Sequence, residues 1–286
     1  MKQKIGFFLI LILLISINVQ AAETKYMQVD DIKMAYQESG TGDTLLLIMG
    51  YGSTMDIWPG TLVDQLAQDY KVIIFDNRGM GNTTAGSKEF SIALFAEDAA
   101  GLLNALKIEK ANVLGWSMGS YIAQELAIRF PSKLRKLILY GSTVGGNQEI
   151  EADPETLAIL NDYSGTPEQI GERFFKLLFP PEFLTANPEF YKTFPVPKEH
   201  SSPENMGKQS MAIQNWPGTI GRINNLKIKT LLLCGTEDVV VPPKNSVELA
   251  QIIPNSWLIQ VDGAGHGLMY QDPKSTVEII KIFLKK

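Results

Sequence analysis

Ser117 lies in the stretch Gly-Trp-Ser-Met-Gly at positions 115–119, where an apolar run gives way to a helical pattern. A strand that passes directly into a helix needs a very tight turn. Glycines two positions before and after the serine remove the Cβ atoms that would collide there. The serine hydroxyl would then project at the carboxyl edge of a sheet, beside the positive end of a helix dipole. This pattern predicts a nucleophile for acyl transfer.

A serine hydroxyl is a poor nucleophile near neutral pH unless a base lies within hydrogen-bond reach. The chain has two histidines. His266 lies in a glycine-rich stretch directly after the apolar run 257–261, so it would leave the same sheet edge as the serine. His200 lies in a polar loop far from any strand-like run. We therefore predict His266 as the base.

A carboxylate is needed to orient that base. Asp238 follows the apolar run 230–235 and is the predicted acid. Glu237 and Asp262 remain alternatives, although each also suits a surface charge. The loop after the run 134–140 offers no early acid, which removes the other obvious strand end.

Two backbone N–H groups must also hold the oxyanion that develops during acyl transfer. Met118 follows the nucleophile and supplies one N–H. The loop after the apolar run 44–49 supplies the other, and Tyr51 is its best candidate because the glycines on either side let the backbone approach a substrate. In other enzymes such donors contribute about 3 kcal/mol each.

Strand-like and helical runs alternate along the chain. A hairpin is predicted over 25–37, and from Thr44 onward the strand-like runs are short and almost unbroken in hydrophobicity, as in a parallel sheet covered on both faces. These strands are expected at 44–49, 71–75, 111–115, 134–140, 230–235 and 257–261, and the helices at 58–67, 91–106, 118–130, 245–253 and 275–284. The fold class is α/β, doubly wound around a mostly parallel sheet.

The segment 144–229 breaks this alternation because it contains no convincing strand. It is rich in proline and phenylalanine, and the stretch Thr-Pro-Glu-Gln at 166–169 has the form of a helix start with a capping box. We expect a helical cap or lid over 144–229. It would separate an N-terminal core part at 22–143 from a C-terminal core part at 230–286.

The first residues have the layout of a secretory signal peptide, with Lys2 and Lys4 before an apolar run and small residues at 21–22. Cleavage after residue 21 would give an exported protein, periplasmic or secreted, with no stable membrane span. An uncleaved anchor is the alternative, although the apolar run is shorter than a span requires. The only cysteine, Cys234, can form no internal disulfide, so thiol chemistry gives no support for export.

With these catalytic candidates and this alternation of strands and helices, the chain resembles a serine α/β-hydrolase of the esterase, lactonase and cofactor-free haloperoxidase-like group. The resemblance covers 25–286, and the order Ser117, Asp238, His266 fits that superfamily. The stretch Asp-Asn-Arg-Gly-Met-Gly at 76–81 resembles the family's D-x-R-G-x-G loop, in which Asp76 and Arg78 would be structural. Many members have His-Gly where this chain has Met-Gly at 49–50, so the hydrogen bonds of that histidine are lost.

Composition and motifs leave little room for other function classes. The formal charge is −5 without any basic patch, which argues against a nucleic-acid partner. The glycines at 79–81 imitate a dinucleotide fingerprint, but Thr84 stands where the third glycine belongs. No metal-ligand spacing occurs, so no cofactor is expected. The predicted partner is a small ester-like substrate. Two alternatives to an esterase remain: a lactonase, perhydrolase or C–C hydrolase with the same triad, and a non-catalytic binding protein.

Overall fold

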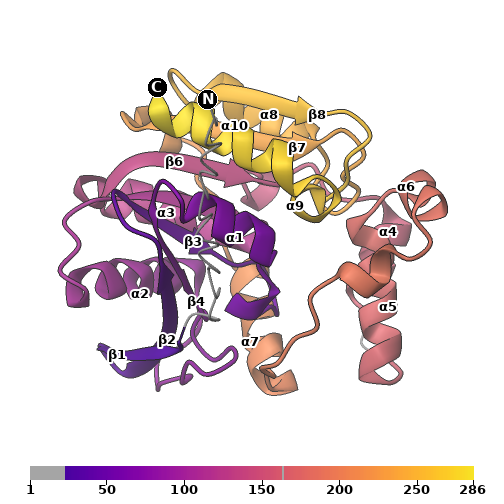
Figure 1. Ribbon diagram of the computed structural model, residues 1–286, viewed down its shortest axis with the longest axis horizontal. Helices are drawn as coiled ribbons and strands as arrows, with labels where there is room; N and C mark the ends of the chain where they lie inside the picture. The colour runs from indigo at the N-terminus through magenta and orange to yellow at the C-terminus, as the bar shows by residue number, and fades with distance from the viewer. Residues whose placement is uncertain (1–22, 163) are drawn as a thin grey trace, which may run out of the picture.

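The computed structural model describes residues 23–162 and 164–286, and the predicted signal peptide at 1–21 lies outside this part of the chain. One eight-stranded sheet runs through the molecule in the order β1-β2-β4-β3-β5-β6-β7-β8 (Figure 1). The strands are β1 (Lys25–Val29), β2 (Ile32–Ser39), β3 (Thr44–Ile48), β4 (Lys71–Phe75), β5 (Ala111–Trp116), β6 (Leu134–Tyr140), β7 (Lys229–Gly235) and β8 (Trp257–Val261).

The six strands from β4 across to β8 are parallel, whereas β1 and β2 form an antiparallel hairpin at one edge. All five residues of β3 and all six of β5 are buried, as expected when helices cover both faces. The predicted α/β class and its strands are confirmed. Because the strands are parallel, the loops that follow β3, β5, β7 and β8 emerge at a common edge.

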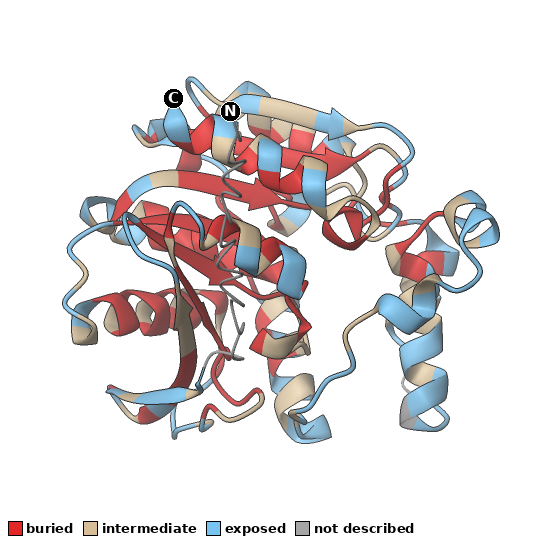
Figure 2. Ribbon diagram, viewed as in Figure 1, coloured by how far each residue is buried: buried red, intermediate tan, exposed pale blue. Residues whose placement is uncertain are grey.

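Helices cover the two faces of the sheet in separate layers (Figure 1). One layer contains α1 (Gly60–Leu66), α9 (Leu268–Gln271) and α10 (Pro273–Lys285); the other contains α2 (Ile92–Ala105), α3 (Met118–Arg129) and α8 (Lys244–Ile252). Figure 2 shows the buried residues concentrated in the central strands and in the inner faces of these helices. The short helix α9 was not predicted, because four residues are too few to show a helical period.

A helical insertion follows β6, as predicted. It contains α4 (Pro154–Leu160), α5 (Pro167–Leu178), α6 (Pro181–Ala186) and α7 (Pro203–Gln214), and the described residues between β6 and β7 form no strand. The predicted capping box is present, because the Thr166 side chain accepts from the Gln169 N–H and Gln169 bonds back to residue 166. A proline begins each of the four helices, at the first-turn position where its missing N–H costs no intrahelical hydrogen bond.

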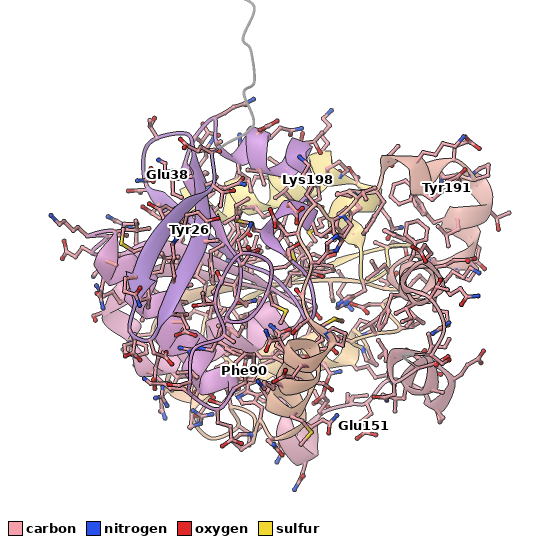
Figure 3. The ribbon with its side chains drawn as sticks, turned by 90° about the horizontal axis from the view of Figure 1, so that it is seen from below. Tyr26, Glu38, Phe90, Glu151, Tyr191 and Lys198 are labelled. Atoms are coloured by element: carbon pink, nitrogen blue, oxygen red, sulfur yellow. The ribbon has the colours of Figure 1, made fainter. Side chains whose placement is uncertain are left out.

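The helices of the insertion differ in their distance from the sheet. α4, α5 and α6 stand out to one side, whereas α7 lies beside the core (Figure 1). Tyr191, on the turn after α6, is at the outer end of the insertion, and Lys198 lies on the segment that returns to the core (Figure 3). No helix in residues 23–162 and 164–286 has the length and apolar character that crossing a membrane requires.

Candidate active site

Ser117 occupies the tight turn between β5 and α3. Its backbone has φ 56° and ψ −127°, a conformation that is strained for any residue with a side chain. A Cβ on Gly115 would lie 2.1 Å from the Gly119 carbonyl oxygen, and a Cβ on Gly119 would lie 2.0 Å from the Ile48 carbonyl oxygen. The two glycines are therefore required by the close approach of α3 to β5 and β3, as the sequence indicated.

A buried polar network holds this turn in place. The Ser117 N–H donates to the Tyr140 carbonyl at 2.9 Å, and the Ser120 hydroxyl donates to the Ser117 carbonyl at 2.6 Å. The Ser120 hydroxyl also lies 2.7 Å from that of Ser142, which accepts from Gln124 Nε2 at 2.9 Å. Sequence reasoning missed Ser120, Gln124 and Ser142, because polar side chains in a helix or in a loop give no sign of which distant residues they will meet.

His266 is buried in the loop after β8, and its imidazole is fixed from several sides. Nδ1 lies 2.8 Å from Asp238 Oδ2. The His266 carbonyl oxygen accepts from Trp116 Nε1 at 3.1 Å and from the Tyr140 hydroxyl at 2.6 Å. The ring also lies next to Gly141, where a Cβ would come within 2.9 Å of Cε1. The backbone and the ring are thus both held in one orientation.

Asp238 is the carboxylate that meets this histidine. Its Oδ1 accepts from the N–H groups of Val240 and Val241, at 3.0 and 2.8 Å, which leaves Oδ2 directed at the imidazole. The side chain is buried, whereas the alternatives Glu237 and Asp262 are both exposed. The structure therefore brings together the predicted acid and the predicted base.

Ser117 and His266 line the same cavity, of about 940 Å³. Within the described chain, the structure shows no hydrogen bond between the serine hydroxyl and the imidazole. Catalytic hydrogen bonds are often long in ligand-free enzymes and tighten when substrate binds. His200 is exposed and also lines this cavity, on the segment that leads to α7, but the Asp238 carboxylate pairs with His266.

The loop after β3 comes directly against the serine. A Cβ on Gly50 would lie 3.2 Å from the Cβ of Ser117, so glycine permits this approach. Tyr51 follows in the same loop and lines the cavity. The Gly52 N–H donates to Gln209 Oε1 at 2.8 Å and is therefore already paired. On the other side of the serine, Met118 is the first residue of α3.

The loop at 76–81 braces the strand end that leads into Tyr51. Asn77 Nδ2 donates to the Met49 carbonyl at 3.0 Å, so a neighbouring loop holds the position where the family resemblance would place a histidine. Asp76 accepts from the N–H groups of Met55 and Asn82, at 2.7 and 3.0 Å. Burial raises the pKa of Asp76 to about 6 despite these two hydrogen bonds.

Arg78 has the structural environment that the resemblance implied. Its buried guanidinium makes two hydrogen bonds to Asp98, at 2.8 and 2.7 Å, and a third to Asp31 at 2.8 Å. The two glycines of this loop lie in close contacts: a Cβ on Gly81 would lie 2.4 Å from Asp76 Oδ2, and a Cβ on Gly79 would lie 2.8 Å from Phe90 Cζ. Their spacing therefore permits a compact, closely packed turn.

The cavity above Ser117 is mainly apolar, and the insertion supplies most of its wall. The apolar lining residues from the insertion include Phe174, Phe175, Leu177, Leu178, Leu184 and Phe194. Several of these rings also pack on one another: Phe175 and Phe194 meet edge to face with centroids 5.4 Å apart. The phenylalanines thus form both a small core and a pocket wall. In the described residues, no group of three or more His, Cys, Asp or Glu side chains could hold a metal ion.

Comparison with known proteins agrees with this architecture. A family model described as "alpha/beta hydrolase fold" matches residues 43–273. A pimeloyl-[acyl-carrier protein] methyl ester esterase of Aeromonas hydrophila is 26% identical over 264 residues, which cover 88% of this chain and all of the relative.

Two solved structures are similar across most of the chain. An alpha/beta hydrolase fold protein from Chitinophaga pinensis has 28% identity and a TM-score of 0.79, covering 92% of this chain and 98% of its own. Est816, described as an N-acyl homoserine lactone degrading enzyme, has 25% identity and a TM-score of 0.75, covering 91% of this chain and all of its own.

Proposed function

Because the chain belongs to the α/β-hydrolase fold family, we propose that it is a serine hydrolase that cleaves a carboxylic ester through an acyl-enzyme. The single observation that carries this proposal is the buried pairing of His266 with Asp238, in a cavity that Ser117 also lines. In this proposal, Ser117 is the nucleophile, His266 the general base and Asp238 the residue that fixes the imidazole tautomer.

The proposed reaction has two stages. His266 Nε2 removes the proton of Ser117 as Oγ attacks the carbonyl carbon, and the N–H groups of Tyr51 and Met118 stabilise the oxyanion. His266 then returns the proton to the leaving alcohol oxygen. Water, activated by the same imidazole, attacks the acyl-enzyme and releases the acid together with free Ser117. The phenylalanine-rich wall supports a substrate with an apolar acyl or alcohol group.

A lactonase is a second candidate. It is favoured by the similarity to Est816, described as degrading an N-acyl homoserine lactone. The same residues would open a lactone, since its ring bond is itself an ester. A panel of linear esters and lactones of graded chain length, matched in acyl group, decides between them: the substrate with the higher kcat/KM identifies the preferred class.

Labelling with a fluorophosphonate tests the proposed nucleophile directly. We expect covalent modification at Ser117, and its loss in Ser117→Ala with the fold retained. Ser201→Ala is the matched control because Ser201 also lines the cavity, and it is expected to leave both labelling and hydrolysis in place. Failure of the folded wild-type protein to react, together with tight binding of an apolar ligand, would support the non-catalytic alternative.

A further inference from the structure

The insertion contacts the loop at 50–53 through one face of α7. Asn205 and Met206 lie four and three positions before Gln209, so each of them shares a face of the helix with Gln209. Asn205 Nδ2 donates to the Gly79 carbonyl at 2.9 Å. A Cβ on Gly52 would lie 3.1 Å from the terminal methyl of Met206. The helix is therefore seated on two core loops at once.

Gln209 makes the polar contact at the centre of this face. Its side chain is fully buried, and Oε1 accepts from the Gly52 N–H at 2.8 Å. Gly52 has φ +67°, so this hydrogen bond holds a peptide group in the left-handed region. The donor is a backbone N–H, which requires that the amide oxygen, and not the nitrogen, of Gln209 face the loop.

The other end of the same amide is unpaired. Gln209 Nε2 is buried and has no hydrogen-bond partner in the described part of the protein. Buried polar groups without a partner are rare, and each requires an explanation. The presence of a glutamine at this buried contact is explained if its acceptor oxygen is needed to bind the Gly52 N–H.

We propose that Gln209 is a positioning residue for the oxyanion site. The inference rests on the proposed function, in which the Tyr51 N–H stabilises the oxyanion. Gln209 holds the peptide between Tyr51 and Gly52. It thereby fixes the direction of the preceding peptide, which carries the Tyr51 N–H. The insertion thus acts on the chemistry through the backbone of this loop, in addition to forming the pocket wall.

The test compares Gln209→Met, which removes the acceptor, with Gln209→Glu, which keeps an acceptor oxygen at the same reach. Loss of an entire oxyanion donor costs 100- to 1,000-fold in kcat in other enzymes. A misdirected donor costs less, so for Gln209→Met we expect kcat to fall about 10- to 100-fold with KM within about twofold. Gln209→Glu is expected to recover most of this activity. Gln214→Met is the matched control, because Gln214 is an exposed glutamine of the same helix.

A second readout separates positioning from general damage. A substrate-like boronic acid forms a tetrahedral adduct with the serine and requires the oxyanion site, whereas the alcohol product does not. Gln209→Met is expected to weaken boronic acid binding by the same factor as kcat and to leave alcohol binding unchanged. Equal weakening of both ligands, unchanged kcat in folded Gln209→Met, or no recovery in Gln209→Glu would each overturn the proposal.

Hydrogen exchange at the Gly52 amide tests the contact without any catalysis. We expect protection in the wild type and in Gln209→Glu, and its loss in Gln209→Met. If Gln209→Met does not fold, Gln209→Glu decides alone: retained Gly52 protection and boronic acid affinity support the proposal, and loss of either overturns it. A wild-type protein that a fluorophosphonate does not label would instead refute the proposed hydrolase function, and Gly52 exchange would still report on the contact.

Discussion

His266 Nδ1 lies 2.8 Å from Asp238 Oδ2, and the other carboxylate oxygen is held by two backbone N–H groups. Asp238 is therefore fixed by its own loop before it meets the imidazole. A carboxylate in this position keeps the proton on Nδ1 and leaves Nε2 as the basic nitrogen. These hydrogen bonds explain how a buried carboxylate and a buried imidazole can lie side by side in mainly apolar surroundings.

Asp238→Asn is expected to lower kcat for ester hydrolysis about 1,000- to 10,000-fold, with little change in thermal stability. The asparagine oxygen can still accept from Val240 and Val241, which directs its NH₂ group toward Nδ1 and favours the wrong imidazole tautomer. Initial rates on a short-chain ester measure the effect. Glu237→Gln and Asp262→Asn are the controls, because both carboxylates are exposed. A comparable loss in either of them would mean that the acid is wrongly assigned.

Gly141→Ala is expected to displace the imidazole. Gly141 has φ +56°, and its added Cβ would lie 2.9 Å from His266 Cε1 and 3.1 Å from Nδ1. We expect kcat to fall about 100-fold, because small misplacements of a catalytic group have effects of this size. Rates of fluorophosphonate labelling and of ester hydrolysis are the measurements, and they are expected to fall in parallel.

Gly221→Ala is the matched control for that prediction. Gly221 has φ +75°, so alanine meets a similar backbone strain there, but its Cβ would have no neighbour within 4 Å. Both variants are expected to lose about 1 kcal/mol of stability from strain. Only Gly141→Ala is expected to lose activity as well. Equal activities in the two variants would show that the space around the imidazole is not restrictive.

The sequence was sufficient to predict the fold because the central strands carry unbroken apolar runs. All seven residues of β6 fall on the predicted strand 134–140, and the five core helices that were predicted lie within two residues of their expected bounds, α9 being the one that was missed. The strand order along the sheet did not follow from the pattern, since hydrophobicity shows that a strand is covered on both faces but not which strand is its neighbour.

The residues of the candidate site could be predicted where their chemical role also leaves a local pattern in the sequence. Glycines flanking Ser117 and a histidine directly after a strand both have local signatures, so these positions could be chosen before any contact was known. Gln209 could not be chosen in this way, because its partner at Gly52 is 157 positions away. A buried glutamine and a solvent-exposed one look alike in a helical pattern.

Gly115→Ala is expected to destabilise the protein by about 3 kcal/mol or more, because its Cβ would lie 2.1 Å from the backbone oxygen of Gly119. To relieve this clash, α3 must move away from β5, and this movement opens the turn that holds Ser117. Urea unfolding measures the change. Gly207→Ala, in the middle of α7, is the control: nothing lies within 4 Å of its Cβ, and the better helix propensity of alanine is expected to stabilise the protein by about 0.5 to 1 kcal/mol.

Glu149→Gln is expected to make the protein more stable at pH 8 but not at pH 4. Burial, and secondarily repulsion from Glu151, raises the pKa of Glu149 to about 7 in the folded protein. Between about pH 4.5 and pH 7 the folded state retains a proton that the unfolded state has lost, so the wild-type protein loses stability as pH rises through this window. Glutamine resembles the protonated acid and removes that loss.

The size of the effect follows from the proton affinities. A tenfold change in affinity corresponds to about 1.4 kcal/mol, and partial solvent access to Glu149 reduces the full effect, so we expect a gain of about 1 to 2 kcal/mol at pH 8. Urea unfolding at pH 4, 6 and 8 measures it. Glu151→Gln is the control: Glu151 is exposed, so its removal is expected to change stability by only a few tenths of a kcal/mol at each pH. A gain for Glu149→Gln that is equally large at pH 4 would mean that improved packing, and not the titration of this carboxyl group, stabilises the variant.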